Sequence, residues 1–150
     1  MAKTLLVNVK EHDFPNRLNR KFVIKADATL FELSCVILTS MLSEYCHIWS
    51  FEHNGTTYDF VDEKENSNAL FEHTVNELIG KSTFSYDYGE GWTFDVTIKE
   101  YSDYSMRQKV YMLDGKGLGI WEDNISGYWD YCDGKTNINA RRKDQWDARF

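Results

Sequence analysis

The stretch FSYDYGEGWTFDVTIKE, residues 84–100, decides the fold of this chain. Large apolar side chains recur at every second position before and after the glycine-containing loop at residues 89–91. Strict period-two alternation around a three-residue loop is typical of a β-hairpin. The sequence therefore predicts a hairpin with one buried aromatic face and one exposed polar face.

The length of the predicted loop sets the register of this hairpin. A three-residue loop places Tyr88 opposite Trp92 and Tyr86 opposite Phe94. These rings then share the buried face, and each cross-strand aromatic pair stabilises a sheet by roughly 0.2–1 kcal/mol. We expect the hairpin to build part of the hydrophobic core.

The polar face of the predicted hairpin carries two carboxylates. In this register Asp87 and Asp95 are diagonal neighbours, about 7–8 Å apart at the backbone. Such a pair can share a divalent cation or act as an acid/base pair, and it can equally be two solvated side chains. We favour solvated side chains, because a cation site usually needs more oxygen ligands than two aspartates supply. Glu122 and Asp123 would complete a cation site only if the fold brings their loop over the hairpin.

Two capping boxes mark the starts of helices. Thr29 and Glu32 precede an apolar stripe at helical spacing, which predicts a helix that ends near Ser43. Thr74 and Glu77 predict a short second helix. Periodicity and turn residues predict strands over 4–9, 20–25, 47–52, 56–60 and 106–113, a loop over 62–68 and a helical turn over 127–131.

These elements predict one α+β domain over residues 1–150. Its first part is a β-grasp-like half, in which a capped helix packs across strands, and the antiparallel aromatic hairpin extends it. No Pro-rich or Gly/Ser-rich linker suggests a domain boundary.

The charge of the chain is uneven. The formal net charge is −7, and residues 86–133, with ten acidic and four basic side chains, carry −6 of it. Such a surface repels a phosphate backbone, so direct nucleic-acid binding is disfavoured. Three cysteines without a pairing motif suit a reducing compartment, and no apolar run is long enough for a signal peptide or a membrane span. We expect a cytoplasmic protein with no membrane contact and no cofactor.

Four large aromatic side chains lie within eleven residues of an acidic, glycine-punctuated segment: Trp121, Tyr128, Trp129 and Tyr131. They either cover an open edge of the core or form a recognition surface, because Trp and Tyr dominate binding hot spots. Both interpretations stand. The residues predicted to contact a partner are Asp87, Glu90, Asp95, Trp121, Glu122, Asp123, Tyr128 and Trp129.

Other motifs that could carry chemistry are weaker. Residues 114–119, DGKGLG, look like a phosphate-binding loop, but acid and bulk follow where a helix should begin. His47 and His53 flank a predicted strand, and a zinc site would need two further ligands. A hydrogen-bonded histidine at a strand end is the better interpretation. Cys132 lies beside two aspartates, which would raise the pKa of its thiol rather than activate it.

Four stretches, in order along the chain, carry a resemblance to a known family: residues 24–33 (IKADATLFEL), 47–51 (HIWSF), 86–94 (YDYGEGWTF) and 120–128 (IWEDNISGY). Together they resemble the plasmid pRi ORF-three-like family, also described as transposon-passenger, resolvase-like proteins. Where the family has a histidine after the hairpin tryptophan, this chain has Phe94, and Ile120 and Trp121 replace two prolines. The resemblance implies an α+β fold and an association with plasmids, phages and transposons, but no particular reaction.

Two functional hypotheses follow. The first is a non-enzymatic binding module linked to mobile genetic elements, whose acidic, aromatic surface contacts a basic protein partner. In its sharper form, the partner is a nucleic-acid-binding defence or replication protein that is inhibited by charge mimicry. The alternative is a metal-assisted hydrolase that uses Asp87, Asp95, Glu122 and Asp123.

Overall fold

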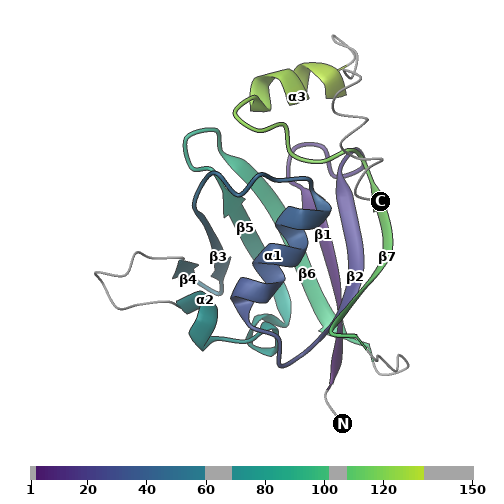
Figure 1. Cartoon of the computed structure of the whole chain (residues 1–150), viewed down its shortest axis with the longest axis vertical. Coiled ribbons are helices and arrows are strands. Elements are labelled where there is room, and N and C mark those ends of the chain that lie inside the picture. Colours follow the sequence, from purple (N-terminus) through teal and green to yellow (C-terminus); the bar gives the residue numbers. More distant parts are fainter. Residues whose placement is uncertain (1–2, 60–68, 102–107, 134–150) are drawn as a thin grey trace.

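Seven antiparallel strands form one sheet in the computed structural model, which describes residues 3–59, 69–101 and 108–133. The strand order is β4-β3-β5-β6-β1-β2-β7. In Figure 1 the helix α1 (Leu30–Ser40) lies across one face of the sheet, and α3 (Ile125–Cys132) lies beyond one end of it. The strands are β1 (Thr4–Glu11), β2 (Asn19–Lys25), β3 (Trp49–His53), β4 (Thr56–Asp59), β5 (Gly80–Tyr86), β6 (Trp92–Glu100) and β7 (Val110–Lys116). The predicted α+β class is confirmed.

The aromatic hairpin forms, but its predicted register is wrong. Tyr86 pairs with Trp92 and Phe84 with Phe94, so the turn has five residues rather than three. The turn is closed by a hydrogen bond from Gly91 N to Asp87 O, at 2.6 Å. Asp87 and Gly91 both adopt a positive φ, which aspartate tolerates better than most residues because its short side chain can bond the nearby backbone.

Because the register differs from the predicted one, the predicted positions of Tyr88 and Asp87 are also wrong. Tyr88 was expected on the buried face, but it lies in the turn and is 52% exposed. Asp87 was expected on the outer face of a strand, but it lies in the turn with its side chain buried. Asp95 pairs with Thr83 across the sheet, so Asp87 and Asp95 are not neighbours on one face.

Helix α1 begins at the predicted capping box. The Glu32 amide donates to the Thr29 hydroxyl at 3.1 Å, and the Thr29 amide donates to the Glu32 carboxylate at 3.2 Å. The helix ends at Ser40, earlier than predicted, because the chain leaves helical geometry and Leu42 reaches a φ of +59°. Its buried face packs on the sheet with the hairpin rings, in a core that includes Leu30, Leu33, Ile37, Phe84, Tyr86, Trp92 and Phe94.

The remaining elements are short. The second capping box starts a 3-10 helix, η2 (Val75–Leu78), where the Thr74 amide donates to the Glu77 carboxylate at 2.6 Å. Helix α2 (Ala69–Glu72) was not predicted. The predicted loop over residues 62–68 and the first part of the predicted strand over 106–113 lie outside the described residues. No helix among the described residues is long and apolar enough to cross a membrane.

Candidate metal centre

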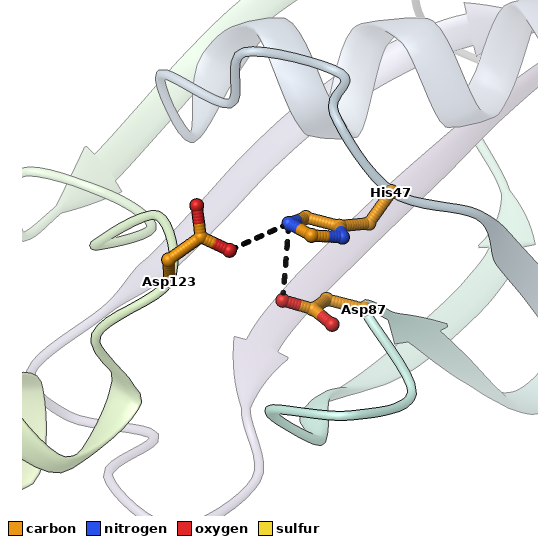
Figure 2. Close-up of side chains that lie close together, drawn as sticks. All are labelled: His47, Asp87 and Asp123. Atoms are coloured by element: carbon orange, nitrogen blue, oxygen red, sulfur yellow. Dashed lines mark hydrogen bonds and ion pairs between the residues drawn. The ribbon is translucent and has the colours of Figure 1, made fainter.

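Three segments that are far apart in the sequence meet at the end of the sheet below α3. They are the loop before β3, the turn after β5 and the loop before α3, and each contributes one side chain: His47, Asp87 and Asp123 (Figure 2). One nitrogen of the imidazole and one oxygen of each carboxylate all lie within 4.8 Å of one another. This cluster, called here the His–Asp–Asp cluster, is the candidate site.

The imidazole of His47 lies between the two carboxylates. Its Nε2 is 2.7 Å from Asp123 Oδ1 and 3.4 Å from Asp87 Oδ2, as the dashed lines of Figure 2 show. A carboxylate oxygen only accepts, so Nε2 carries the proton in the hydrogen bond to Asp123. The three side chains differ in exposure: 30% for His47, 8% for Asp87 and 69% for Asp123. The cluster is therefore closed on the side of Asp87 and open to solvent on the side of Asp123.

Asp87 has one oxygen that is buried without a hydrogen bond. Its Oδ1 accepts from the Glu90 amide at 3.3 Å, within the turn. Its Oδ2 has no hydrogen-bond partner among the described residues, although it lies in ion-pair range of His47. A buried carboxylate oxygen without a partner costs free energy, so such an oxygen calls for an explanation.

The backbone at both aspartates is in the left-handed region. The φ angle is +59° at Asp87 and +56° at Asp123, in a protein where only five non-glycine residues among those described have a positive φ. Non-glycine residues adopt this conformation at a cost, and such residues concentrate at functional sites. The two turns therefore accept strained backbone at the positions that direct these carboxylates at His47.

The two carboxylates also change the pKa of His47. Burial of the ring lowers this pKa, but the hydrogen bond to Asp123 and the negative charges of Asp87, Asp123 and Glu122 outweigh burial. The net effect raises the pKa of His47 above its ordinary value. The two carboxylates thus favour the protonated form of the imidazole.

Glu122, next to Asp123, fastens the loop to the rest of the fold. Its carboxylate accepts from the Tyr86 hydroxyl at 3.0 Å, the Ser43 hydroxyl at 2.9 Å and the Glu44 amide at 2.8 Å. These donors come from β5 and from the segment after α1. Because all three bonds end on one carboxylate, Glu122 fixes where the following residue lies relative to His47.

The hydroxyl of Tyr86 is the inner partner of this network. The side chain is fully buried, and its oxygen accepts from the Cys46 amide at 3.0 Å while donating to Glu122. Burial, together with the Glu122 charge, raises the pKa of Tyr86 to about 12. The hydroxyl therefore keeps its proton and acts as a hydrogen-bond donor, not as a base.

The cluster has the donors that a transition-metal site needs, and the separation of His47 from Asp87 fits such a site. Imidazole and carboxylate together suit zinc and its neighbours in the first transition row. Ligands about 2.0–2.2 Å from a tetrahedral zinc lie about 3.3 Å apart, close to the 3.4 Å between His47 and Asp87. Asp123 Oδ1 lies 2.7 Å from His47 Nε2, so the Asp123 side chain would have to move outward by less than about 1 Å to reach this spacing. Asp123 is the most exposed residue of the three. Its exposure makes that adjustment possible without disturbing the core.

The carboxylates of Asp95 and Glu90 do not belong to this cluster. Asp95 lies on β6 and forms an ion pair with His12 at 3.1 Å, where both side chains are more than half exposed. Glu90 lies in the turn after β5, and its carboxylate accepts from the Ile125 amide at 3.3 Å, at the start of α3. Glu122 and Asp123, in contrast, do approach the hairpin, which the sequence alone left open.

The predicted aromatic residues divide between the core and the surface. Trp121 is 7% exposed and Tyr128 is 3% exposed, and both belong to the hydrophobic core. Tyr128 packs on Trp92 with ring centres 5.0 Å apart. Trp129 is 38% exposed. Among the aromatic residues predicted to contact a partner, Trp129 therefore has the most accessible side chain.

His47 is the member of the cluster that the sequence hypothesis left out of the metal site. The sequence suggests His53 as its partner in a metal site. In the structure His53 Nδ1 instead shares a hydrogen bond with the Ser82 hydroxyl, at 2.9 Å. One sequence signal could have identified the correct set. The stretches 47–51, 86–94 and 120–128, quoted above for their resemblance, each contain one member of the cluster.

Comparison with known proteins places the chain in a family. No curated protein matches it. Among solved structures, the fold is similar to the crystal structure of a protein of unknown function from Methanosarcina mazei Go1, with a TM-score of 0.71 and 14% sequence identity over 97% of this chain and 88% of that one. At this identity the likeness shows the fold alone. The sequence profile of the family described as plasmid pRiA4b ORF-3-like protein matches residues 3–148, which confirms the resemblance, and the chain belongs to this family.

Proposed function

We propose that this protein binds a divalent metal ion between His47, Asp87 and Asp123 and is a metal-assisted hydrolase. The observation that carries the proposal is the convergence of one imidazole nitrogen and two carboxylate oxygens, one of which is buried without a hydrogen bond. A metal ion would supply the missing partner of Asp87 Oδ2 and would replace the proton of His47. Binding of the metal would thus offset the free-energy cost of burying Asp87 Oδ2 without a hydrogen bond.

The charge of the cluster suits a divalent cation. Two ionised aspartates and a neutral imidazole sum to −2, which a divalent ion neutralises. Glu122 adds a further negative charge close by, as its effect on the pKa of His47 shows. A cation is therefore attracted to this end of the sheet. Because Asp87 is buried, salt screens this attraction less than it would screen the attraction of an exposed site.

Three protein ligands would leave one position of a tetrahedral metal ion for a water molecule. Catalytic zinc sites have three protein ligands and keep the remaining position for water, whereas structural sites are closed by four. A divalent ion such as zinc held by these residues would supply hydroxide near neutral pH by lowering the pKa of bound water. The exposed side of the cluster, at Asp123, is where a substrate oxygen can enter.

The roles of the residues differ from those of the four carboxylates expected from the sequence. His47, Asp87 and Asp123 would hold the metal, and Asp95 is too remote because it lies on β6 beside His12. Glu122 already accepts three hydrogen bonds, so it positions the loop rather than taking a proton.

The metal site is tested by thermal melts of the full chain with Mg²⁺, Mn²⁺, Ca²⁺ and Zn²⁺. A cation present at one hundred times its dissociation constant stabilises the folded state by about 2.7 kcal/mol, which raises the melting temperature by about 5–11 °C in a chain of this size. Asp87→Asn keeps an acceptor at Oδ1 and tolerates the positive φ, so we expect it to fold normally and to lose most of this shift.

Asp95→Asn is the matched control. It removes the same charge from an exposed position on β6, so its response to metal should equal that of the wild type. The absence of a shift with all four cations would contradict the metal site. An equal shift in the two variants would place the bound cation outside the His–Asp–Asp cluster.

Hydrolysis is tested separately, with 4-nitrophenyl phosphate, bis(4-nitrophenyl) phosphate and 4-nitrophenyl acetate. We expect turnover of at least one ester class that requires the stabilising metal, persists in Asp95→Asn and is lost in Asp87→Asn. Metal binding without metal-dependent turnover of any of these esters would support the metal site and count against hydrolysis of both ester classes.

A second candidate function is recognition of a basic protein partner by the acidic, aromatic surface. What favours it is the exposure of Tyr88 and Trp129, at 52% and 38%, within the segment that carries −6 of the net charge. Exposed Tyr and Trp beside carboxylates suit a partner that presents Lys and Arg. A nucleic-acid-binding defence or replication protein has such a surface.

This candidate is tested by affinity capture from the native host, followed by binding measurements at low and high salt. We expect a basic partner whose affinity falls steeply as salt increases, and falls again in Trp129→Ala. Binding that does not change with salt would rule out charge mimicry. Since Trp129 is not part of the His–Asp–Asp cluster, its replacement leaves the test of metal binding unaffected.

A further inference from the structure

A pocket lies between the β1–β2 turn and the start of α3, apart from the residues of the His–Asp–Asp cluster. It has a volume of about 420 Å³, within the range of small-molecule sites. Three parts of the chain form it: the turn between β1 and β2, the glycine-rich segment at the end of β7, and the segment from Trp121 into α3. The lining residues that carry the argument below are Arg17, Lys116, Trp121, Tyr128 and Tyr131.

The charge of this pocket is opposite to that of the protein. Arg17 and Lys116 line it, and none of the described residues that line it is acidic, although the chain as a whole carries −7. Both basic side chains belong to exposed residues. Within the described residues the Arg17 guanidinium forms no ion pair, so its donors are available to a ligand. A negatively charged group is the natural partner of such a site.

One wall of the pocket is aromatic. The rings of Trp121 and Tyr131 stack at 5.6 Å, with 29° between their planes. The Arg17 guanidinium carbon lies 5.5 Å from the centre of the Tyr131 ring, in the range of a cation–π contact. The contact holds the cation beside the aromatic wall. Since Trp121 is 7% exposed, the partly exposed Tyr131 presents the accessible part of this wall, and a planar ring that packs against it can carry an anionic group to Arg17.

The opposite wall is held in place from inside the protein. The buried guanidinium of Arg20 donates to the carbonyls of Lys116 at 2.8 Å, Gly117 at 2.9 Å and Ser40 at 2.9 Å. Gly117 packs so closely that a Cβ there would lie 2.1 Å from the carbonyl oxygen of Arg17. These contacts fix the glycine-rich segment against the β1–β2 turn, so the pocket exists before a ligand arrives.

We infer that this pocket binds a small molecule that combines a planar ring with a carboxylate or a similar anionic group. The pocket has the volume and the aromatic wall that such a ligand needs, and a guanidinium that forms no ion pair with any other described residue. The inference does not depend on the metal centre, because no residue is common to the two sites.

The test uses the full chain and two probes that share one ring system, 2-naphthoate and the uncharged 2-naphthalenemethanol. Binding is followed by NMR of the ¹⁵N-labelled protein. We expect 2-naphthoate to shift the amides of residues 115–119, Trp121 and Tyr131, and to bind about tenfold or more tightly than the alcohol, as one charge-assisted contact provides. No detectable binding of 2-naphthoate at millimolar concentration, or shifts located elsewhere, would overturn the inference.

Two variants with the same change in charge test whether Arg17 is the basic side chain that binds the anionic group. Arg17→Gln removes a charge at an exposed position and should abolish the preference for 2-naphthoate over the alcohol. Lys99→Gln removes the same charge from an exposed position on β6 outside the pocket and should leave that preference intact. Equal affinities of the wild type for the two probes, or an unchanged preference in Arg17→Gln, would also overturn the inference.

Discussion

Removal of the Glu122 carboxylate should release the loop that carries Asp123. In Glu122→Ala the hydroxyls of Tyr86 and Ser43 and the amide of Glu44 lose their common acceptor. A net hydrogen bond contributes about 1 kcal/mol and one to a charged group about 1.5–3 kcal/mol. Since Glu122 is partly exposed, we take the lower values and expect about 3 kcal/mol of destabilisation.

A double-mutant cycle isolates the bond between Tyr86 and Glu122. Tyr86→Phe keeps the buried ring and removes only the hydroxyl, which also accepts from the Cys46 amide. We expect this variant to lose about 2 kcal/mol, and the double variant to lose less than the sum of the single ones. The difference, the coupling energy of the two side chains, should be about 1.5 kcal/mol.

Urea unfolding at pH 7, in buffer that contains a chelator, measures the four free energies. The matched control is the cycle of Tyr88→Phe and Glu90→Ala, two residues of the same hairpin turn between which no contact is observed. Its coupling energy should lie within about 0.3 kcal/mol of zero. A coupling energy below about 0.5 kcal/mol for Tyr86 and Glu122 would refute the role assigned to Glu122 as the fastening of the loop.

Further predictions concern the backbone, the His–Asp–Asp cluster and the helix cap. Gly119→Ala should prevent stable folding, because the φ of Gly119 is +135° and a Cβ there would lie 2.0 Å from the Met41 carbonyl oxygen. Gly91→Ala is its control: a Cβ there meets open space, and the variant should lose about 1 kcal/mol of unfolding free energy in urea. The raised pKa of His47 means that its stabilising ion pairs are fully present below about pH 6.5 and are lost as the pH rises through the raised pKa. The stability difference between wild type and His47→Gln without metal should therefore shrink with rising pH, and a constant difference between pH 5.5 and 9 would contradict the ion pairs. Thr29→Ala should cost about 1 kcal/mol by the same assay, and no loss would contradict the capping role.

The elements of the fold were predictable where the signal is local. The capping box at Thr29 and the alternation along the hairpin depend on residues a few positions apart, and both elements form close to the predicted places. The register of the hairpin was not predictable from the loop glycines. It depends on Asp87, a non-glycine residue that adopts a positive φ and lengthens the turn to five residues.

The candidate site was predictable only in part. The sequence predicts a site that includes Asp87 and Asp123, and the fold does bring these two carboxylates together. It also includes Asp95, because the predicted register of the hairpin is incorrect. His47 was missed because nothing in its own neighbourhood distinguishes it from a histidine at a strand end. Its role depends on the packing of three segments separated by about forty residues each, which periodicity and capping signals cannot report.

Anomalous diffraction from crystals grown with Zn²⁺ or Mn²⁺ tests the central claim most directly. The account predicts one strong anomalous peak from a metal ion that is coordinated by His47 Nε2, Asp87 Oδ2 and Asp123 Oδ1. For zinc, the distances from the ion to these atoms should be about 2.0–2.2 Å. It also predicts that Asp87→Asn crystals lack this peak. Crystals that contain the metal elsewhere, or that show His47 still hydrogen-bonded to Asp123 with no metal between them, would contradict it.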